Sequence, residues 1–244
     1  MNAQDGSESP QRRRRNLYGR RKGPALSAHQ ESLRATLLPS LLLRPEMGKD
    51  PRAYFSPPPL RDFGDVSEVW LEVGYGAGEH LLWQAQHHPR IGLIGAEPYI
   101  AGTAKLLSRL EQQPAENVRL YEDDARDIID ALPDASIGRF FLLFPDPWPK
   151  TRHHKRRFVQ MPMLDALARI LKPGAELRFA SDDAGYLAHA LERLMAHAAF
   201  AWTATGPSDW KARPADWPPT RYEAKELHGP PAFLRFVRTD KIAA

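Results

Sequence analysis

Short apolar runs and amphipathic helical patterns alternate along most of the chain. The apolar runs predict strands at residues 69–73, 92–96, 118–121, 139–144 and 176–180. Apolar positions at helical spacing predict helices over residues 79–87, 100–112, 125–132, 162–171 and 184–199. A last pair of strands is predicted at residues 200–203 and 232–237. Strands that alternate with helices are typical of parallel sheets. We therefore predict an α/β fold with a mostly parallel seven-stranded sheet, helices on both faces and an antiparallel C-terminal strand pair.

The chain divides into one domain and two preceding segments. Residues 1–28 are polar and arginine-rich, so we expect a basic arm without stable structure. This arm should affect the binding of polyanions, but neither the fold nor the binding of small ligands. Residues 29–62 form a helical lead-in segment, with Leu33, Leu37 and Leu41 at helical spacing and three prolines at 57–59. Residues 63–240 are the predicted domain.

Composition excludes several classes of protein. No window approaches the roughly 18 uncharged apolar residues of a membrane helix, and no apolar core follows the first basic residues as it would in a signal peptide. We expect a cytoplasmic protein with no membrane partner. The absence of cysteine excludes disulfides, thiolate metal sites and a cysteine nucleophile.

Basic residues are clustered, although the net charge is only +4. The first cluster comprises Arg12, Arg13, Arg14, Arg15, Arg20, Arg21 and Lys22, and the second comprises Lys150, Arg152, Lys155, Arg156 and Arg157. A single cluster is often only a solvated face, but two favour a polyanionic partner. His153 and His154 lie within the second cluster, and adjacent histidines make a poor metal pair. We predict no metal site.

A glycine-rich turn follows the first predicted strand. Gly74, Gly76 and Gly78 alternate before a helix, so a ligand could approach the backbone there, as in nucleotide-binding folds. Glu79 replaces the third glycine of a dinucleotide fingerprint and Glu72 adds a second carboxylate, and both would repel a pyrophosphate. Because S-adenosylmethionine carries a sulfonium, an ammonium and no phosphate, the acidic residues favour it over a dinucleotide. An oxidoreductase is disfavoured for the same reason.

Acidic residues also end the next two predicted strands. Glu97 lies where nucleotide-binding folds place an acceptor for ribose hydroxyls, and Asp124 could accept from an adenine amino group. Either residue alone would more often be a helix cap or face solvent. Together with the glycine turn, they strengthen the prediction of a nucleoside cofactor.

A proline-locked loop follows the fourth predicted strand. Its sequence, Phe-Pro-Asp-Pro-Trp-Pro-Lys at residues 144–150, presents Asp146 and Trp148 with little conformational freedom. With the basic residues that follow, this loop resembles the bacterial tRNA (guanine-N7-)-methyltransferase family. The resemblance also covers Leu-Glu-Val-Gly at 71–74, Gly-Arg-Arg at 19–21, Thr-Arg-Tyr-Glu at 220–223, and Asp182 followed by Tyr186.

The resemblance implies a Rossmann-like class I methyltransferase fold and transfer of a methyl group from S-adenosylmethionine to N7 of a guanosine in tRNA, guanine 46 of the variable loop. Cofactor contacts are implied for Glu72, Glu97, Asp124 and Asp146, in addition to the turn glycines Gly74, Gly76 and Gly78. Asp146 is also the implied catalytic residue. Substrate contacts are implied for Lys150, Asp182, Thr220, Arg221, Tyr222 and Glu223.

The chemistry of guanine N7 agrees with these implied roles. N7 has a lone pair and no proton, so its methylation needs alignment and no strong base. The product is cationic, so the Asp146 carboxylate could stabilise the developing charge, although an aspartate between prolines can also simply form a turn. Trp148 could stack on a base or cap the sheet edge.

Other functions and states stay open at the level of sequence. A class I methyltransferase for another substrate and a non-catalytic RNA-binding protein with this fold are the alternatives. The oligomeric state, monomer or homodimer, is also open.

Overall fold

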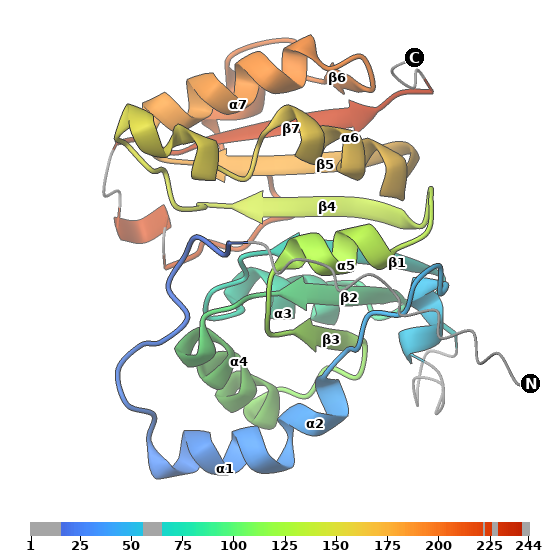
Figure 1. Ribbon diagram of the computed structural model, residues 1–244, viewed down its shortest axis with the longest axis vertical. Helices are drawn as coiled ribbons and strands as arrows, with labels where there is room; N and C mark the ends of the chain where they lie inside the picture. The colour runs from blue at the N-terminus through green and yellow to red at the C-terminus, as the bar shows by residue number, and fades with distance from the viewer. Residues whose placement is uncertain (1–15, 56–64, 222, 226–228, 241–244) are drawn as a thin grey trace, which may run out of the picture.

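The structure is a computed structural model that describes residues 16–55, 65–221, 223–225 and 229–240. Its strands are β1 (Glu68–Val73), β2 (Ile91–Ala96), β3 (Val118–Tyr121), β4 (Ile137–Leu143), β5 (Leu171–Ser181), β6 (Phe200–Trp202) and β7 (Ala232–Arg238). They form one seven-stranded sheet with the order β3-β2-β1-β4-β5-β7-β6 (Figure 1). β1 to β5 are parallel, and β7 runs antiparallel between β5 and β6. The predicted fold class is confirmed.

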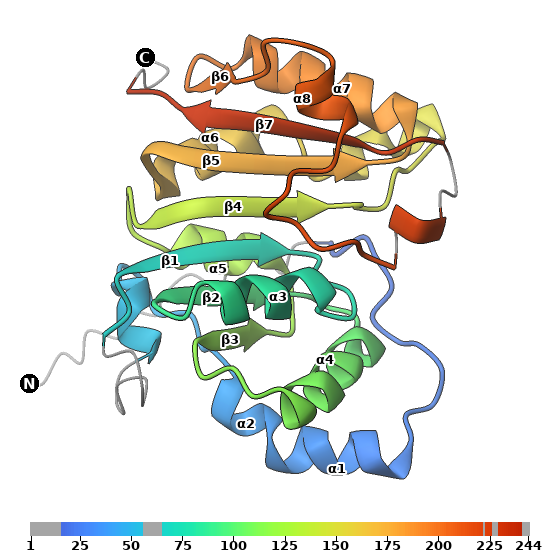
Figure 2. The ribbon, with the colours of Figure 1, turned by 180° about the vertical axis from the view of Figure 1, so that it is seen from behind.

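Helices cover both faces of the sheet. The α-helices are α1 (Ala28–Thr36), α2 (Leu38–Leu41), α3 (Glu79–His87), α4 (Ile100–Gln112), α5 (Ala125–Ala131), α6 (Met161–Ile170), α7 (Ala184–Ala196) and α8 (Ser208–Lys211). Short 3-10 helices are η1 (Pro51–Phe55), η2 (Thr151–Arg156) and η3 (Glu223–Lys225). Figure 1 shows α5 and α6 in front of the sheet, whereas α3 lies in front in the reverse view of Figure 2.

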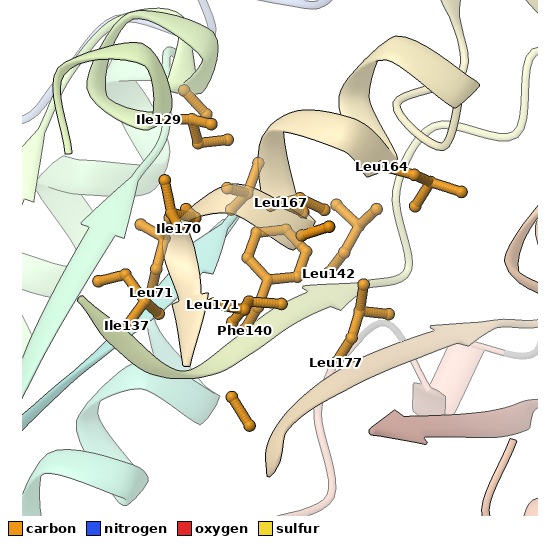
Figure 3. Close-up of a cluster of buried hydrophobic side chains, with 14 of the residues drawn as sticks. Leu71, Ile129, Ile137, Phe140, Leu142, Leu164, Leu167, Ile170, Leu171 and Leu177 are labelled. Atoms are coloured by element: carbon orange, nitrogen blue, oxygen red, sulfur yellow. The ribbon is translucent and has the colours of Figure 1, made fainter. Parts of the chain in front are cut away.

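The alternation of side chains along the central strands divides the core into two layers. Leu71, Phe140 and Leu142 belong to the cluster under α5, α6 and α7 (Figure 3). Their neighbours Trp70 and Phe141 point to the other face and join the cluster under α1, α3 and α4. Successive strand residues alternate between faces, and a sheet that is apolar on both faces must be covered on both.

Two predicted elements differ from the structure because of local backbone geometry. The helix predicted over residues 162–171 ends at Ile170, and Leu171 already pairs with Ile137 of β4. The register then shifts, so that Arg139 pairs with Glu176, and the Lys172-Pro173-Gly174 turn lies inside β5 as an irregularity. The lead-in helix is likewise interrupted at Leu37, and α2 follows with a proline near its start.

Four short elements were not predicted from the sequence: α8 and the three 3-10 helices. Each has at most six residues, which is too short to show a helical period. The prolines at 57–59 and the arginines at 12–15 lie outside the described residues. Because β1 to β4 are parallel, their carboxyl ends meet at one edge of the sheet, where the turns and loops that follow them come together.

Candidate functional site

A cavity of about 490 Å³ lies at the carboxyl edge of the sheet. Its walls come from the ends of β1, β2 and β4, from α4, α5 and α7, and from the chain before α1. Six of the residues expected from the sequence to contact cofactor or substrate line it: Gly74, Gly76, Glu97, Asp124, Asp146 and Arg221. Residues that lie up to 147 positions apart in the sequence are therefore brought together at one site.

The glycine turn after β1 turns its backbone toward this cavity. Gly74 and Gly76 have φ of +76° and +55°, a region that disfavours residues with a Cβ. A Cβ on Gly102 of α4 would clash with the Gly76 carbonyl oxygen, so the helix packs tightly behind the turn. Tyr75 points into the core, and its hydroxyl lies 2.8 Å from the Thr103 hydroxyl. These contacts fix the turn against α4.

Glu97 is the acidic residue that follows β2. Its carboxylate accepts hydrogen bonds from the Gly76 and Tyr99 backbone N–H groups, each at 2.9 Å. Burial raises the pKa of this carboxyl group, and the neighbouring Asp146 and Glu72 carboxylates raise it further. A cation or a hydroxyl donor in the cavity would stabilise the ionised form of Glu97.

Asp124 lines the cavity and also begins α5. Its carboxylate accepts from the Arg126 backbone N–H at 3.0 Å, as a helix N-cap does, and forms an ion pair with the Arg126 guanidinium. That guanidinium also donates to the Asn16 carbonyl at 2.8 Å. The capping role considered for Asp124 is present, and it is compatible with the position of this residue at the cavity wall.

Glu72 is absent from the residues that line the cavity. It is 2% exposed, and its carboxylate lies 2.7 Å from His80 Nδ1. The Gln84 side-chain amide lies 3.1 Å from His80 Nε2 and donates to the Asp216 carbonyl at 2.9 Å. Glu72 therefore lies behind the glycine turn, at one end of a buried chain of polar groups, and does not reach the cavity.

The proline-locked loop after β4 carries Asp146 into the cavity. Phe144 and Trp148 on either side of Asp146 have φ of +50° and +47°, conformations that are unfavourable for residues other than glycine. The Phe144 N–H donates to the Ala180 carbonyl of β5 at 2.7 Å. Such strain persists only where surrounding contacts hold the chain, and it is found preferentially at functional sites.

The described part of the N-terminal arm contacts the domain, contrary to the expectation for the whole segment 1–28. Residues 17–20 line the cavity, and the Arg21 guanidinium lies 2.7 Å from the Asp123 carboxylate. The Arg156 guanidinium lies over both the Tyr18 and Trp148 rings, 5.0 and 4.9 Å from their centroids. Ion-pair and cation–π contacts do not require apolar residues at regular spacing, so the hydrophobic pattern of the sequence could not predict them. In Figure 1 the arm is the blue segment that leads to α1.

The second basic cluster has two kinds of member. Lys150, Arg152 and Lys155 are exposed. Arg157 is only 4% exposed, and its guanidinium donates to two backbone carbonyls, so it is not available for phosphate contacts. Because burial is set by tertiary packing, a run of charges in the sequence could not distinguish these roles.

The stretch expected to contact substrate reaches the cavity through Arg221. The Arg221 N–H donates to the Glu79 carboxylate at 3.0 Å, and Glu79 also pairs with Arg109 at 2.8 Å. Glu223 pairs with Arg213 at 2.8 Å. Lys150, Asp182, Thr220 and Glu223 are not among the residues that line the cavity, and Tyr222 lies outside the described residues.

Other lining residues were not singled out as contacts from the sequence. They include Tyr18, Tyr99, Lys105, Phe158 and Tyr186. The sequence pointed to Tyr186 only through its spacing from Asp182, yet Tyr186 lines the cavity with Asp146. Its position depends on how α7 packs on β5, which the local sequence does not encode.

No helix in residues 16–55, 65–221, 223–225 and 229–240 is long and apolar enough to cross a membrane. Within those same ranges, no group of three or more His, Cys, Asp or Glu side chains is arranged to hold a metal ion.

Comparisons with known proteins give first the class and then the family. A family model described as "Putative methyltransferase" matches residues 67–230. The fold is similar to that of a solved rRNA methylase from Streptococcus thermophilus, with a TM-score of 0.50 and 14% identity over 72% of this chain and 89% of that one. The chain thus has the Rossmann-like class I methyltransferase fold.

Relatives of high identity define the family more narrowly. The tRNA (guanine-N(7)-)-methyltransferase of Rhodospirillum rubrum is 48% identical over 93% of this chain and 89% of its own length. The tRNA (guanine-N(7)-)-methyltransferase of Brucella abortus is 46% identical over 94% of this chain and 97% of its own length. The chain belongs to the tRNA (guanine-N(7)-)-methyltransferase family.

Proposed function

We propose that this chain transfers a methyl group from S-adenosylmethionine to N7 of a guanosine in tRNA, at guanine 46 of the variable loop, in the cytoplasm. The observation that carries the proposal is the acid-lined cavity beside the strained loop that holds Asp146. Family membership supports the same reaction. Glu97, Asp124 and Asp146 give the cavity a negative character that suits a cationic cofactor better than a phosphate-bearing one.

The residues present fit S-adenosylmethionine. Glu97 uses one hydrogen bond on each carboxylate oxygen for the backbone, which leaves further lone pairs for ribose hydroxyls. Gly74 and Gly76 present bare backbone, and Asp124 at the cavity wall can accept from an adenine amino group. Glu72 contributes negative charge from behind the turn.

When bound, S-adenosylmethionine supplies an electrophilic methyl group on a positively charged sulfur. The protein's task is then to hold guanine so that N7 faces that methyl group, because a lone pair without a proton needs no general base. Asp146 accepts hydrogen bonds from guanine N–H groups and stabilises the positive charge that the ring acquires. The three prolines and the anchored ends of the loop hold this carboxylate in place before the substrate binds.

Substrate contacts are proposed for residues around the mouth of the cavity. The exposed Lys150, with Arg152 and Lys155 near it, contacts tRNA phosphates, which gives affinity and register without base specificity. Asp182, Thr220, Arg221, Tyr222 and Glu223 contact the substrate near the guanosine. Of these, Arg221 has the most direct support, because it lines the cavity.

The test is nucleoside analysis of tRNA after incubation with the purified protein and S-adenosylmethionine. We expect 7-methylguanosine to appear in tRNA that lacked it. The same tRNA with guanosine 46 replaced by adenosine should stay unmodified. Methylation at another base or atom would refute the assigned reaction, and methylation of the replaced tRNA would refute the assigned position. Binding of tRNA without binding of S-adenosylmethionine would favour a non-catalytic RNA-binding role.

A further inference from the structure

Arg157 is a buried arginine in a cluster of otherwise more exposed basic residues. Its Nε donates to the Pro147 carbonyl at 2.8 Å, and its Nη1 donates to the Gly185 carbonyl at 3.0 Å. Pro147 is next to Asp146 in the loop, and Gly185 is in the first turn of α7. One guanidinium therefore ties the loop that holds Asp146 to the helix that follows Asp182.

The loop needs such an external anchor. Prolines at 145, 147 and 149 have no backbone N–H, so at these positions only a carbonyl can take part in a backbone hydrogen bond. Phe144 and Trp148 also adopt left-handed backbone conformations, which are energetically unfavourable for residues with a Cβ. The hydrogen bond from Arg157 to Pro147 acts between these two strained positions.

Further contacts connect Arg157 and Phe158 to the start of α7. The Tyr186 hydroxyl accepts from the Phe158 N–H at 2.9 Å, directly after Arg157, and the Arg157 guanidinium lies 5.0 Å from the centre of the Tyr186 ring. The Tyr186 N–H in turn donates to the Asp183 carboxylate at 2.6 Å, which caps α7. Loop, arginine and helix start thus form one connected unit against the cavity.

We propose that Arg157 is a positioning residue, whose bridge between the Pro147 and Gly185 carbonyls sets the place of Asp146 relative to the guanine and to the start of α7. The inference rests on the proposed function, because it names how the catalytic carboxylate of that site is held. The planar guanidinium fork is essential, since a lysine ammonium at the end of a flexible stem cannot hold the two carbonyls in the same fixed geometry. A displacement of about 1 Å of a reacting group can lower a rate by about 100-fold.

The variant that tests this role is Arg157→Lys, which keeps the charge. We expect its single-turnover rate at saturating tRNA and S-adenosylmethionine to fall by about 10-fold to 100-fold. Its half-saturating tRNA concentration and its affinity for S-adenosylmethionine should each stay within about threefold of the parental values. If Arg157 instead bound a tRNA phosphate, the variant would keep the parental rate at saturation and would need a higher tRNA concentration for half-saturation.

The matched control is Arg169→Lys. Arg169 also donates to two carbonyls, those of Leu132 and Ile129, each at 2.7 Å, but it joins α6 to α5 and does not line the cavity. This control should lose stability without losing the saturated rate. Parental turnover in Arg157→Lys, or an equal loss of turnover in the control, would overturn the proposal.

A second variant keeps the test decisive if Arg157→Lys does not fold. Tyr186→Phe removes only the hydroxyl that holds Phe158, and we expect it to lower the saturated rate at least threefold with tRNA half-saturation unchanged. A parental rate in that variant would refute the positioning role. A parental protein that makes no 7-methylguanosine would instead refute the proposed function, so the two failures are distinguishable.

Discussion

At the scale of single residues, the acidic side chains of the site are held in different ways. Glu97 is buried and bonded to two backbone N–H groups, whereas Asp124 is paired with Arg126 and Glu72 with His80. Asp146 instead depends on the loop that carries it. The carboxylates proposed for cofactor binding and catalysis are therefore held by different contacts, and Asp124 also caps α5.

The raised pKa of Glu97 gives cofactor binding a pH dependence with a defined sign. A cationic ligand with hydroxyl donors favours the ionised carboxylate, so binding lowers the pKa of Glu97 and releases a proton. Affinity for S-adenosylmethionine should therefore be full above the raised pKa of the cofactor-free protein and fall as the pH drops through that value. Calorimetry across about pH 4.5 to 8, in buffers of different ionisation enthalpy, measures both the affinity and the released proton.

The control for this effect is Glu97→Gln. We expect it to bind S-adenosylmethionine more weakly by about 1.5 to 3 kcal/mol at neutral pH, because charge-assisted hydrogen bonds are lost. Its pH slope should be flatter than that of the parental protein. An unchanged slope would assign the linked proton to another group.

Asp146→Asn separates chemistry from binding. The substitution is nearly isosteric and removes the negative charge that we propose stabilises the cationic product, so the single-turnover rate should fall at least 100-fold. Because phosphate contacts supply most of the tRNA affinity, tRNA binding should stay within about threefold. Near-parental methyl transfer at saturating substrates would remove Asp146 from catalysis.

At the scale of elements, the N-terminal arm differs most from its sequence-based description. Its contacts to Asp123, Arg126 and Arg156 bring residues 17–20 to the cavity wall. Deleting residues 1–22 should therefore weaken binding of S-adenosylmethionine by at least about threefold, in contrast to the expectation from composition that small-ligand binding is unaffected.

The matched truncation removes residues 1–15 only. It eliminates Arg12 to Arg15 but keeps the part that lines the cavity, so cofactor affinity should stay parental while the salt dependence of tRNA binding becomes shallower. Calorimetry for the cofactor and binding titrations across a salt series for tRNA distinguish the two truncations. Equal cofactor affinities in both would show that residues 16–22 do not contribute.

The long elements could be predicted from the sequence and the short ones could not. The spacing of apolar residues predicted the bounds of α3 and α4, because each helix has at least nine residues and one buried face. The bulge in β5 was missed because Lys172-Pro173-Gly174 has the composition of a loop. At the cavity, Gly74, Gly76, Glu97, Asp124 and Asp146 could be inferred from their places after strands, whereas Gly78 packs against Leu106 and does not line the cavity. The positions of Tyr18, Arg157 and Tyr186 depend on long-range packing.

At the scale of the whole molecule, an ion pair between a buried arginine and a partly exposed aspartate attaches the chain before Thr220 to the sheet. The Arg178 guanidinium on β5 lies 2.8 Å from the Asp216 carboxylate and 2.7 Å from that of Glu176, and it lies between the rings of Phe141 and Trp217. The segment that leads to Arg221 is thereby held at the face opposite α6. Arg178 thus connects the sheet to the segment that leads to Arg221 at the cavity wall.

Arg178→Met should lower the free energy of unfolding by about 1.5 to 3 kcal/mol, because it removes the charge-assisted hydrogen bonds from the buried guanidinium to Glu176 and Asp216, although Arg139 still pairs with both carboxylates. It should also raise the half-saturating tRNA concentration, since the segment before Thr220 loses its anchor. Urea denaturation and steady-state kinetics measure the two effects. Arg193→Met is the control, because Arg193 pairs with an exposed Glu192 and such pairs contribute less than about 1 kcal/mol. Equal destabilisation in both variants would contradict the role of Arg178.

The lead-in segment covers part of the sheet edge formed by β3. β3 is an outer strand of only four residues, and the Leu43 N–H donates to the Leu120 carbonyl at 2.8 Å, while Leu42 forms a parallel bridge with Leu120. At the opposite edge, β6 has three residues. Exposed sheet edges are templates for strand addition between molecules, and short or covered edges prevent it. The segment before the domain therefore covers part of the β3 edge and leaves fewer free backbone groups there for strand addition by another molecule.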